Sequence, residues 1–193
     1  VMRKQEGKMT YIGGGEESYG YLPQDFVRDK DAVSSCVMIA EMAAWAKDNG
    51  MSLYELLKNI YAEYGFSKEI GISITKKGKT GADEIKQMMI DFRNNPPKEL
   101  ANSQIVLIKD FKTLTAIDLL NDTKSELDMP TSSNVIQYFT KDGSKVSVRP
   151  SGTEPKIKFY IEVSSSLESV SKYEETDRLA EEKIKQIRTS LNI

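Results

Sequence analysis

The stretch SKVSVRPSGTEPKIKFYIEV, residues 144–163, contains two runs of alternating apolar and polar residues, separated by a short turn with two prolines and one glycine. Such alternation is typical of strands with one buried face, and turn-forming residues between two such runs indicate a tight connection. The stretch therefore predicts two neighbouring strands, with residues 149–153 held where they join at the edge of a sheet.

The sequence on both sides of this stretch predicts an α+β domain over residues 66–193. Alternating or apolar runs predict further strands at 70–78, 104–109 and 135–140, and residues 121–134 between them are polar and rich in turn formers. Two helices are predicted, one capped at Thr80 and ending before Pro96, the other over residues 174–191 with Ala180, Ile184, Ile187 and Leu191 on one face. This order of elements predicts a mainly antiparallel sheet with helices covering one face.

Residues 1–65 have a different pattern and are expected to form a separate domain. A short strand at 9–12 is predicted to lead into the glycine-rich run GGGEESYG, residues 13–20. The alanine- and methionine-rich run at 31–48 predicts a helix that is apolar on nearly every side and therefore buried. A capping box at Ser52–Glu55 predicts a second, amphipathic helix that ends at Gly65.

Composition excludes several classes of function. The 193 residues include 27 basic and 29 acidic side chains, so the mixed charge favours neither nucleic acid nor an anionic membrane surface. Histidine is absent from the chain, which excludes Ser-His and Cys-His nucleophilic sites and histidine-based zinc motifs within it. A single cysteine, no signal-peptide core and no apolar run of membrane-spanning length favour a cytoplasmic setting.

The turn at residues 149–153 carries the side chains expected of a phosphate site. The guanidinium of Arg149 matches two phosphate oxygens, and Ser151 and Thr153 add hydroxyl donors. Gly152 permits close approach of backbone amides to an anion, while the flanking prolines stiffen the loop. A plain proline-glycine turn with a surface arginine would have the same composition, so the chemistry alone leaves both interpretations open.

The glycine-rich run at 13–20 differs from known phosphate loops, because it lacks the GK[ST] ending of a P-loop and the spacing of a dinucleotide fingerprint. Its carboxylates, Glu16 and Glu17, would repel phosphate but would accept hydrogen bonds from vicinal sugar hydroxyls, with Ser18 beside them. An acidic loop together with a phosphate loop indicates a phosphosugar ligand. An ordinary solvated glycine turn is the alternative.

Lys30 lies in the charged run RDKD that precedes the apolar helix. Asp29 or Asp31 at this place would cap the first turn of the helix, which is a routine structural role. If Lys30 instead faces the ligand, it could exchange a proton with a sugar hydroxyl, provided that neighbouring cations lower its pKa.

Three motifs in this order, GGGEESYG, RDKDAV and VRPSGTEPKIKFY, resemble the C-terminal part of an α-D-phosphohexomutase of the phosphoglucomutase/phosphomannomutase type. The resemblance covers essentially the whole chain. It implies an α/β remnant of the third domain over residues 1–65, followed over 66–193 by the fourth domain, an α+β fold similar to the TATA-box-binding protein. It also implies that the chain is a fragment whose N-terminal domains are missing and would be its partners.

The resemblance implies roles for particular residues. Members of the family move a phosphoryl group between a phosphoserine and a hexose monophosphate, through a bisphosphate such as glucose 1,6-bisphosphate. By this likeness the substrate-binding residues are Glu16, Ser18, Lys30, Arg149, Ser151, Gly152 and Thr153, with an acid/base role for Lys30 as a further expectation. Ser18-Tyr19-Gly20 is similar to phosphoglucomutases, so glucose phosphate is the first choice of substrate, with mannose and pentose phosphates as alternatives.

The sequence departs from a whole mutase in two places. No serine loop of the TASHNP type and no DGDxDR-like magnesium run occur in it, so Mg²⁺ is expected to bind in the full enzyme and not to ligands in this chain. Because phosphoryl transfer depends on positioning and charge neutralisation, the fragment is expected to be inactive. A stand-alone phosphosugar-binding module and a plain interaction domain are the alternative hypotheses.

Overall fold

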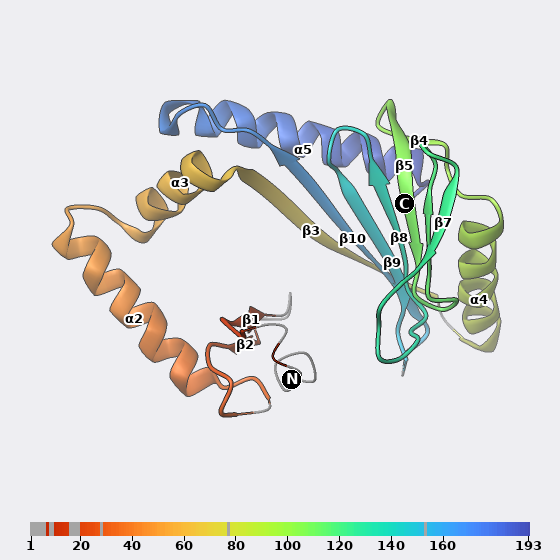
Figure 1. The fold of residues 1–193 in the computed structure, drawn as a ribbon, viewed down its shortest axis with the longest axis horizontal. Coiled ribbons are helices and arrows are strands. Elements are labelled where there is room, and N and C mark those ends of the chain that lie inside the picture. Colours follow the sequence, from red (N-terminus) through yellow and green to blue (C-terminus); the bar gives the residue numbers. More distant parts are fainter. Residues whose placement is uncertain (1–6, 8–9, 16–19, 28, 77, 153) are drawn as a thin grey trace. The chain divides into compact units, whose positions relative to one another are not determined.

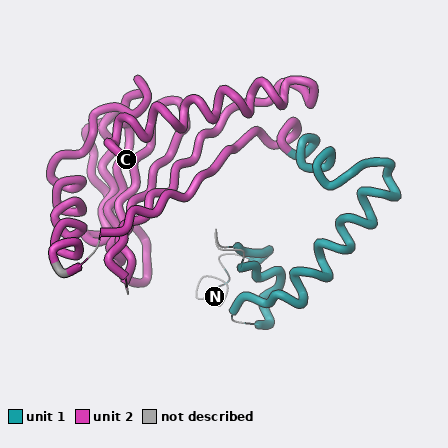
Figure 2. The backbone as a smooth tube through the Cα atoms, turned by 180° about the vertical axis from the view of Figure 1, so that it is seen from behind, with its two compact units in different colours: residues 1–60 teal, residues 61–193 magenta. Residues whose placement is uncertain are grey.

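The computed structural model describes residues 7, 10–15, 20–27, 29–76, 78–152 and 154–193. The chain forms two compact units, residues 1–60 and 61–193, shown in teal and magenta in Figure 2. Each unit is described by itself.

The first unit contains a small hairpin and two helices. Strands β1 (Gly14–Gly15) and β2 (Tyr21–Leu22) pair antiparallel, and helices α2 (Ala32–Asp48) and α3 (Leu53–Tyr64) follow. The predicted stop of α2 is confirmed, because the helix ends at Asp48 with Asn49 as its C-cap, and Gly50 follows at φ 71°. The predicted capping box is confirmed as well: the Ser52 amide donates to Glu55 at 2.7 Å, and the Glu55 amide donates to the Ser52 hydroxyl at 3.2 Å.

Two expectations for this unit are wrong. Residues 10–12 form no strand, and strand pairing begins instead at Gly14. Before this point, the Tyr11 hydroxyl donates a hydrogen bond to the Leu22 carbonyl at 2.6 Å. The helix predicted to be buried forms where it was predicted, but Ala46 is its only fully buried residue. Val33 is 75% exposed and Trp45 55% exposed, because nothing in the described part of the chain covers these faces.

The second unit is built on a sheet of eight strands (Figure 1). Its strands are β3 (Phe66–Thr75), β4 (Glu99–Leu100), β5 (Ser103–Asp110), β6 (Thr115–Asp118), β7 (Thr123–Glu126), β8 (Ile136–Thr140), β9 (Lys145–Pro150) and β10 (Lys156–Ser165). They follow the order β3-β10-β9-β8-β5-β6-β7, with β4 paired to β5, and every pairing is antiparallel. The predicted fold class, an α/β remnant followed by an α+β domain, is confirmed.

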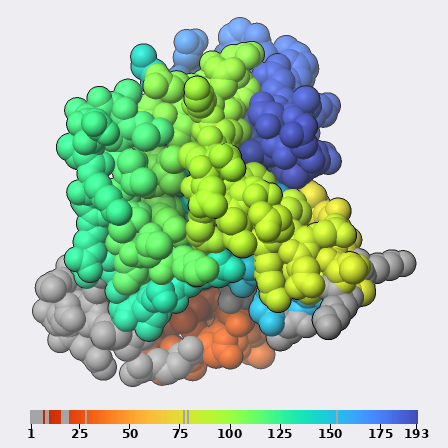
Figure 3. All heavy atoms as spheres, turned by 90° about the vertical axis from the view of Figure 1, so that its right-hand side faces the viewer, coloured from red at the N-terminus to blue at the C-terminus, as the bar shows by residue number. Residues whose placement is uncertain are grey.

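Helices α4 (Gly78–Asn94) and α5 (Tyr173–Ser190) pack on the sheet, mainly against β9, β10 and β3. A short 3-10 turn, η1 (Val170–Lys172), leads into α5. The stripe predicted on α5 is confirmed, since Ala180, Ile184, Ile187 and Leu191 are all buried. In Figure 3 the outer surface of α4 is visible in yellow-green and the end of α5 in dark blue.

The core lies between these helices and one face of the sheet. Alternate residues of β10 are buried there, while those between them are only partly covered on the opposite face. Phe92 of α4 meets Phe159 of β10 edge to face, with ring centroids 5.8 Å apart. Because the helices cover one face only, the other face of β9 and β10 is left for polar side chains.

Local details of this unit differ from the sequence predictions. Helix α4 begins at Gly78, so Thr80 lies inside the first turn and not at the cap. The run 121–134, expected to be turns, contains strand β7, which pairs with β6 as a hairpin. All four residues of β7 are exposed. The strand therefore lacks the alternation of apolar and polar residues by which a half-buried strand is recognised in a sequence.

The division between the units falls inside α3, between Ile60 and Tyr61. The Tyr61 ring packs on Phe66 at 5.1 Å and on Tyr173 at 6.1 Å, so the last turn of α3 belongs to the core of the second unit. Gly65, at φ 102°, provides the left-handed backbone that joins this turn to β3. The domain boundary at 65/66 stays a prediction.

The turn between β8 and β9 is fastened to α5 through Asp142. The carboxylate accepts hydrogen bonds from the Thr140 hydroxyl at 2.6 Å and from Lys183 Nζ at 2.5 Å, and the Ser144 amide donates to it at 3.3 Å. Burial raises the pKa of Asp142, but the bonds from Lys183, Thr140 and Ser144 outweigh it and hold the pKa below its ordinary value.

We expect Asp142→Asn to destabilise the second unit at pH 7 but to have much less effect at pH 2–3. A carboxyl whose folded pKa is depressed contributes stability above its unfolded pKa of about 3.9, and this contribution is lost as the pH falls toward the folded pKa. Thermal unfolding of wild type and variant between pH 7 and pH 2 measures the difference. An equal difference in Tm at both ends of this range would contradict the assignment.

Candidate functional site

The glycine-rich run is held as a hairpin whose stem needs glycine. In the β1–β2 pair, Gly15 lies opposite Tyr21, and a Cβ on Gly15 would approach the Tyr21 ring at 3.0 Å. A Cβ on Gly14 would meet the Tyr11 hydroxyl at 3.1 Å. Side chains at either position would push these tyrosines away, so the glycines allow the loop that follows to start from a closed stem.

The start of α2 is tied to the same hairpin. Asp31 is the N-cap, and its carboxylate accepts hydrogen bonds from the amides of Val33 at 3.0 Å and Ser34 at 3.3 Å. The Asp31 amide in turn donates to the Tyr21 carbonyl of β2 at 3.0 Å. Of the two caps considered from the sequence, Asp31 is therefore the one that forms, and it fixes residue 30 beside the glycine stem.

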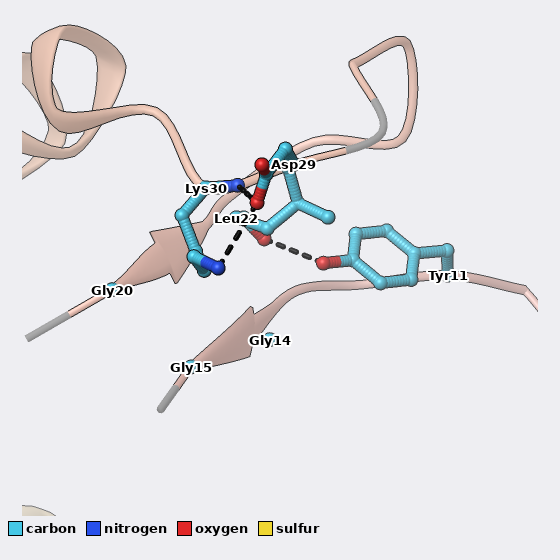
Figure 4. A pocket seen from close by; sticks show the side chains of 7 residues that line it. All are labelled: Tyr11, Gly14, Gly15, Gly20, Leu22, Asp29 and Lys30. Carbon is cyan, nitrogen blue, oxygen red and sulfur yellow. Dashed lines mark hydrogen bonds and ion pairs between the residues drawn. The ribbon is translucent and has the colours of Figure 1, made fainter. Parts of the chain in front are cut away.

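Lys30 lines a pocket of about 270 Å³ together with Asp29, Tyr11, Leu22 and glycines of the stem (Figure 4). The sequence-predicted Lys30 and the start of the glycine-rich run are thus brought together within the first unit. Glu16 and Ser18, the predicted sugar-binding residues, lie outside the described residues.

Asp29 is the charged partner of Lys30 in this pocket. Lys30 Nζ lies 3.1 Å from Asp29 Oδ1, and the Lys30 amide donates to the same oxygen at 2.7 Å. The hydrogen bond from the Lys30 backbone amide is the main reason that the pKa of Asp29 lies below its ordinary value. The Lys30 side chain lowers this pKa further. A carboxylate at this distance stabilises the ammonium form of a lysine, which can donate hydrogen bonds but cannot accept a proton.

In the second unit, the SGTEP turn is held by its own backbone. The Ser151 amide donates to the Lys156 carbonyl at 2.8 Å, and the Lys156 amide donates to the Glu154 carbonyl at 2.8 Å. The Pro155 carbonyl accepts from the Lys76 amide at 2.9 Å, next to the end of β3. The described residues of the turn are therefore anchored on both sides by backbone hydrogen bonds.

Arg149 and Lys158 occupy directly opposite positions in the β9–β10 pair. Opposite residues of an antiparallel pair point to the same face, and here their neighbours Val148 and Phe159 are buried on the helix-covered face. Both cations therefore stand on the open face, where Arg149 is exposed and Lys158 partly covered, with its Nζ 6.0 Å from the Tyr160 ring centroid. Like charges directly opposite one another destabilise a sheet, and an anion between them would remove that repulsion.

The neighbouring Lys156 carries its own counter-ion. Its Nζ lies 2.6 Å from Glu154 Oε2, and this bond is the main reason that the pKa of Glu154 lies below its ordinary value. The charge of Lys158 also contributes to lowering this pKa, so Lys156 and Lys158 both lie near the Glu154 carboxylate.

Ser151 and Gly152 lie at the mouth of the turn. The Ser151 hydroxyl accepts from the Glu154 amide at 3.3 Å, which leaves its proton available to an outside acceptor. Gly152 has open space where a Cβ would be, and its φ lies outside the left-handed region, so neither packing nor backbone conformation requires glycine there. Thr153 lies outside the described residues.

The sequence interpretation missed Lys158. The signal was present, because β10 alternates and the turn of five residues places residue 158 opposite 149 once Pro150 is paired with Ile157. The structure brings Arg149, Ser151 and Gly152 together in one turn, while Lys30 belongs to the other unit.

Neither a metal site nor a membrane span is found in the described residues. No three acidic or cysteine side chains gather there to hold a metal ion. No helix within the same residues combines the length and the apolar character needed to cross a bilayer.

Comparison with known proteins matches both units to one family. Residues 1–64 match "Phosphoglucomutase/phosphomannomutase, alpha/beta/alpha domain III", and residues 99–182 match the C-terminal domain of the same family. The chain is 39% identical over 160 residues to a phosphoglucomutase of Staphylococcus aureus strain MRSA252, covering 83% of the chain and 29% of that protein. It is 34% identical over 172 residues to a phosphoglucomutase of Staphylococcus haemolyticus, covering 89% of the chain and 31% of that protein.

A solved structure has a similar fold. The pp63/parafusin phosphoglucomutase of Paramecium, in its open form, matches 98% of this chain and 31% of its own with a TM-score of 0.56 at 16% identity. The chain thus spans about 30% of the length of the relatives that it matches. The two domain matches follow one another along the chain in the order of the family's domains. The chain therefore belongs to the phosphoglucomutase/phosphomannomutase family and corresponds to its third and C-terminal domains.

Proposed function

We propose that this chain is the sugar- and phosphate-binding part of a phosphohexomutase that interconverts hexose 1-phosphate and hexose 6-phosphate through an enzyme phosphoserine and a bisphosphate intermediate. Family membership supports the reaction class. The pairing of Arg149 with Lys158 at the mouth of the SGTEP turn is the observation that carries the binding role.

The second unit would bind the phosphate that is not reacting. Two cations on one face of a rigid hairpin supply charge, the Ser151 hydroxyl supplies a donor, and Gly152 leaves the backbone open to a phosphate oxygen. Thr153 is proposed as a further donor on the sequence pattern. Backbone hydrogen bonds already hold the described residues on either side of Thr153, which would reduce the conformational entropy lost on binding.

The first unit would bind the sugar. On the sequence motif, Glu16 and Ser18 are proposed to accept and donate hydrogen bonds to its hydroxyls. Lys30, which lines the pocket, is proposed as a further contact. The Asp29 partner favours the ammonium form of Lys30, so we propose Lys30 as a hydrogen-bond donor to substrate oxygens and not as the general base. Glucose phosphate is the proposed substrate, because Ser18-Tyr19-Gly20 is similar to phosphoglucomutases.

The transferring groups would come from elsewhere in the whole protein. The chain contains neither a TASHNP-type serine loop nor a DGDxDR-like run. We therefore propose that the chain binds the hexose phosphate and glucose 1,6-bisphosphate but shows no turnover alone.

Arg149→Ala is expected to weaken binding of glucose 1,6-bisphosphate to the 193-residue chain by about 10-fold or more, because a hydrogen bond to a charged group contributes about 1.5–3 kcal/mol. Isothermal titration calorimetry measures the change. Arg178→Ala is the matched control, since Arg178 is an exposed α5 arginine paired with Glu182. Equal affinities for wild type and Arg149→Ala would remove the phosphate site from the proposal.

Lys158→Gln is expected to lower affinity for the bisphosphate several-fold, because it removes one of the two cations that lie opposite each other in the β9–β10 pair. Isothermal titration calorimetry measures the affinity, and thermal unfolding without ligand measures the stability of the variant. A variant that loses stability but keeps wild-type affinity would show that Lys158 is a packing residue.

Gly152→Ala is expected to weaken phosphate binding without lowering Tm, because the added methyl group meets no protein atom but blocks the backbone from the ligand. Gly143→Ala is the reciprocal control: Gly143 lies in the β8–β9 turn at φ 87°, where alanine is strained, so Tm should fall and affinity should not. Unchanged affinity for Gly152→Ala would contradict close approach of the ligand at this residue.

A further inference from the structure

Residue 76 joins the end of strand β3 to the SGTEP turn. Strand β3 pairs with β10 as far as Thr75, which lies opposite Lys156. The next residue along the chain, Lys76, donates its backbone amide to the Pro155 carbonyl at 2.9 Å. Pro155 belongs to the limb of the turn that leads into β10. The Lys76 amide therefore ties this limb to a segment that lies outside the β9–β10 pair.

This tie reaches the candidate phosphate-binding residues through the backbone of the turn. The Lys156 amide donates to the Glu154 carbonyl, and the Ser151 amide donates to the Lys156 carbonyl, each at 2.8 Å. Ser151 follows directly after the strand β9 that carries Arg149. A displaced Pro155 would therefore move the Lys156 carbonyl, which is the acceptor that holds the Ser151 backbone in place.

Helix α4 confines residue 76 from the other side. Gly81, near the start of this helix, is buried, and a Cβ at this position would lie 2.5 Å from the Lys76 carbonyl oxygen and 2.7 Å from the Lys76 Cβ. Non-bonded carbon atoms at optimal separation are about 3.5–4.0 Å apart. Further along the helix, Glu84 Oε2 lies 3.1 Å from Lys76 Nζ. Helix and residue 76 therefore approach each other at a place where no side chain fits.

A methyl group at residue 81 would displace residue 76 and not the helix. Ile85 and Met89 lie four and eight residues after Gly81, so all three share one helical face, and both side chains are buried in the core. Moving α4 outward would therefore expose apolar surface to water. Residue 76 is only partly buried and lies beyond the last pair of β3, so its backbone is the easier one to move.

We propose that Gly81 is a positioning residue for the SGTEP turn: the absence of a side chain lets Lys76 lie where its amide holds the Pro155 carbonyl. Gly81 belongs to α4 and not to the turn, so it acts on a ligand through residue 76. The inference rests on the proposed function in so far as the turn binds phosphate, whereas the contact and the hydrogen bonds that link Gly81 to the turn do not. A glycine needed only for the stability of the helix is the alternative.

Amide hydrogen exchange and ligand titration of wild type, Gly81→Ala and Gly143→Ala in the 193-residue chain test this proposal. Exchange of the Lys76, Ser151 and Lys156 amides is followed by NMR relative to the amides of β5, at a temperature where each protein is folded. Isothermal titration calorimetry measures affinity for glucose 1,6-bisphosphate. Gly143→Ala is the matched control, because it strains the β8–β9 turn and should lower Tm without acting on residue 76.

In Gly81→Ala the three amides should exchange at least about 10-fold faster relative to β5, and the bisphosphate should bind at least about 5-fold more weakly, because a binding site tolerates little displacement of its groups. Gly143→Ala should change neither quantity. Unchanged relative exchange of the three amides in Gly81→Ala would overturn the proposal, as would wild-type affinity in this variant. Absence of binding by wild type would instead contradict the proposed function, and the exchange rates would still decide the role of Gly81.

Lys76→Pro provides a second test that does not depend on the folding of Gly81→Ala. It removes the amide that donates to the Pro155 carbonyl and adds no side chain to α4. The Ser151 and Lys156 amides should exchange faster in this variant as well, and the bisphosphate should bind more weakly. Wild-type exchange of both amides would show that the bond from residue 76 does not hold the turn, and the proposal would be wrong.

Discussion

The pairing of β9 with β10 is the constraint on which the candidate phosphate site depends. Val148, Ile157 and Phe159 are buried without measurable exposure beneath the helices, so the strands cannot slip by one residue without moving these side chains to the open face. That fixed register places Arg149 opposite Lys158 and sets the length of the turn between the strands. The packing of the hydrophobic core thus determines the positions of the Arg149 and Lys158 side chains.

The two units position functional groups by different means. In the second unit a large sheet holds a short turn, and the charges are carried by strand residues whose direction the core dictates. In the first unit, Lys30 is positioned by the hairpin of the two-residue strands β1 and β2 and by the Asp31 cap of helix α2. The described residues leave apolar faces of α2 uncovered. The candidate phosphate-binding residues of the second unit therefore lie on a sheet with a core of its own, whereas Lys30 of the first unit lies beside a helix whose apolar faces the described residues leave uncovered.

Much of the fold could be predicted from sequence where the pattern reflects burial. The alternation in β8–β10 and the stripe on α5 arise from one-sided packing, so both were found correctly. Exposed β7 carries no such pattern and was missed, and the predicted cap at Thr80 was overridden by a helix that starts at Gly78. The apolar composition of α2 predicted a buried helix, and this was wrong among the described residues, where Ala46 alone is buried. Arg149, Ser151 and Gly152 were chosen as candidates from the motif alone, whereas adding Lys158 to them needs the pairing of Pro150 with Ile157 as well.

The strand order has a consequence for how this unit is made. Strand β3, the first of the second unit, pairs along its whole length with β10, the last, so that Phe66 lies opposite Ser165. A nascent chain that emerges at roughly 5–20 residues per second must expose β3, with its Ile70, Ile72 and Ile74, for several seconds before its partner is synthesised. Pairing of strands that lie far apart in the sequence is also slower than formation of a local hairpin. The sheet of this unit can therefore be completed only after β10 has been synthesised.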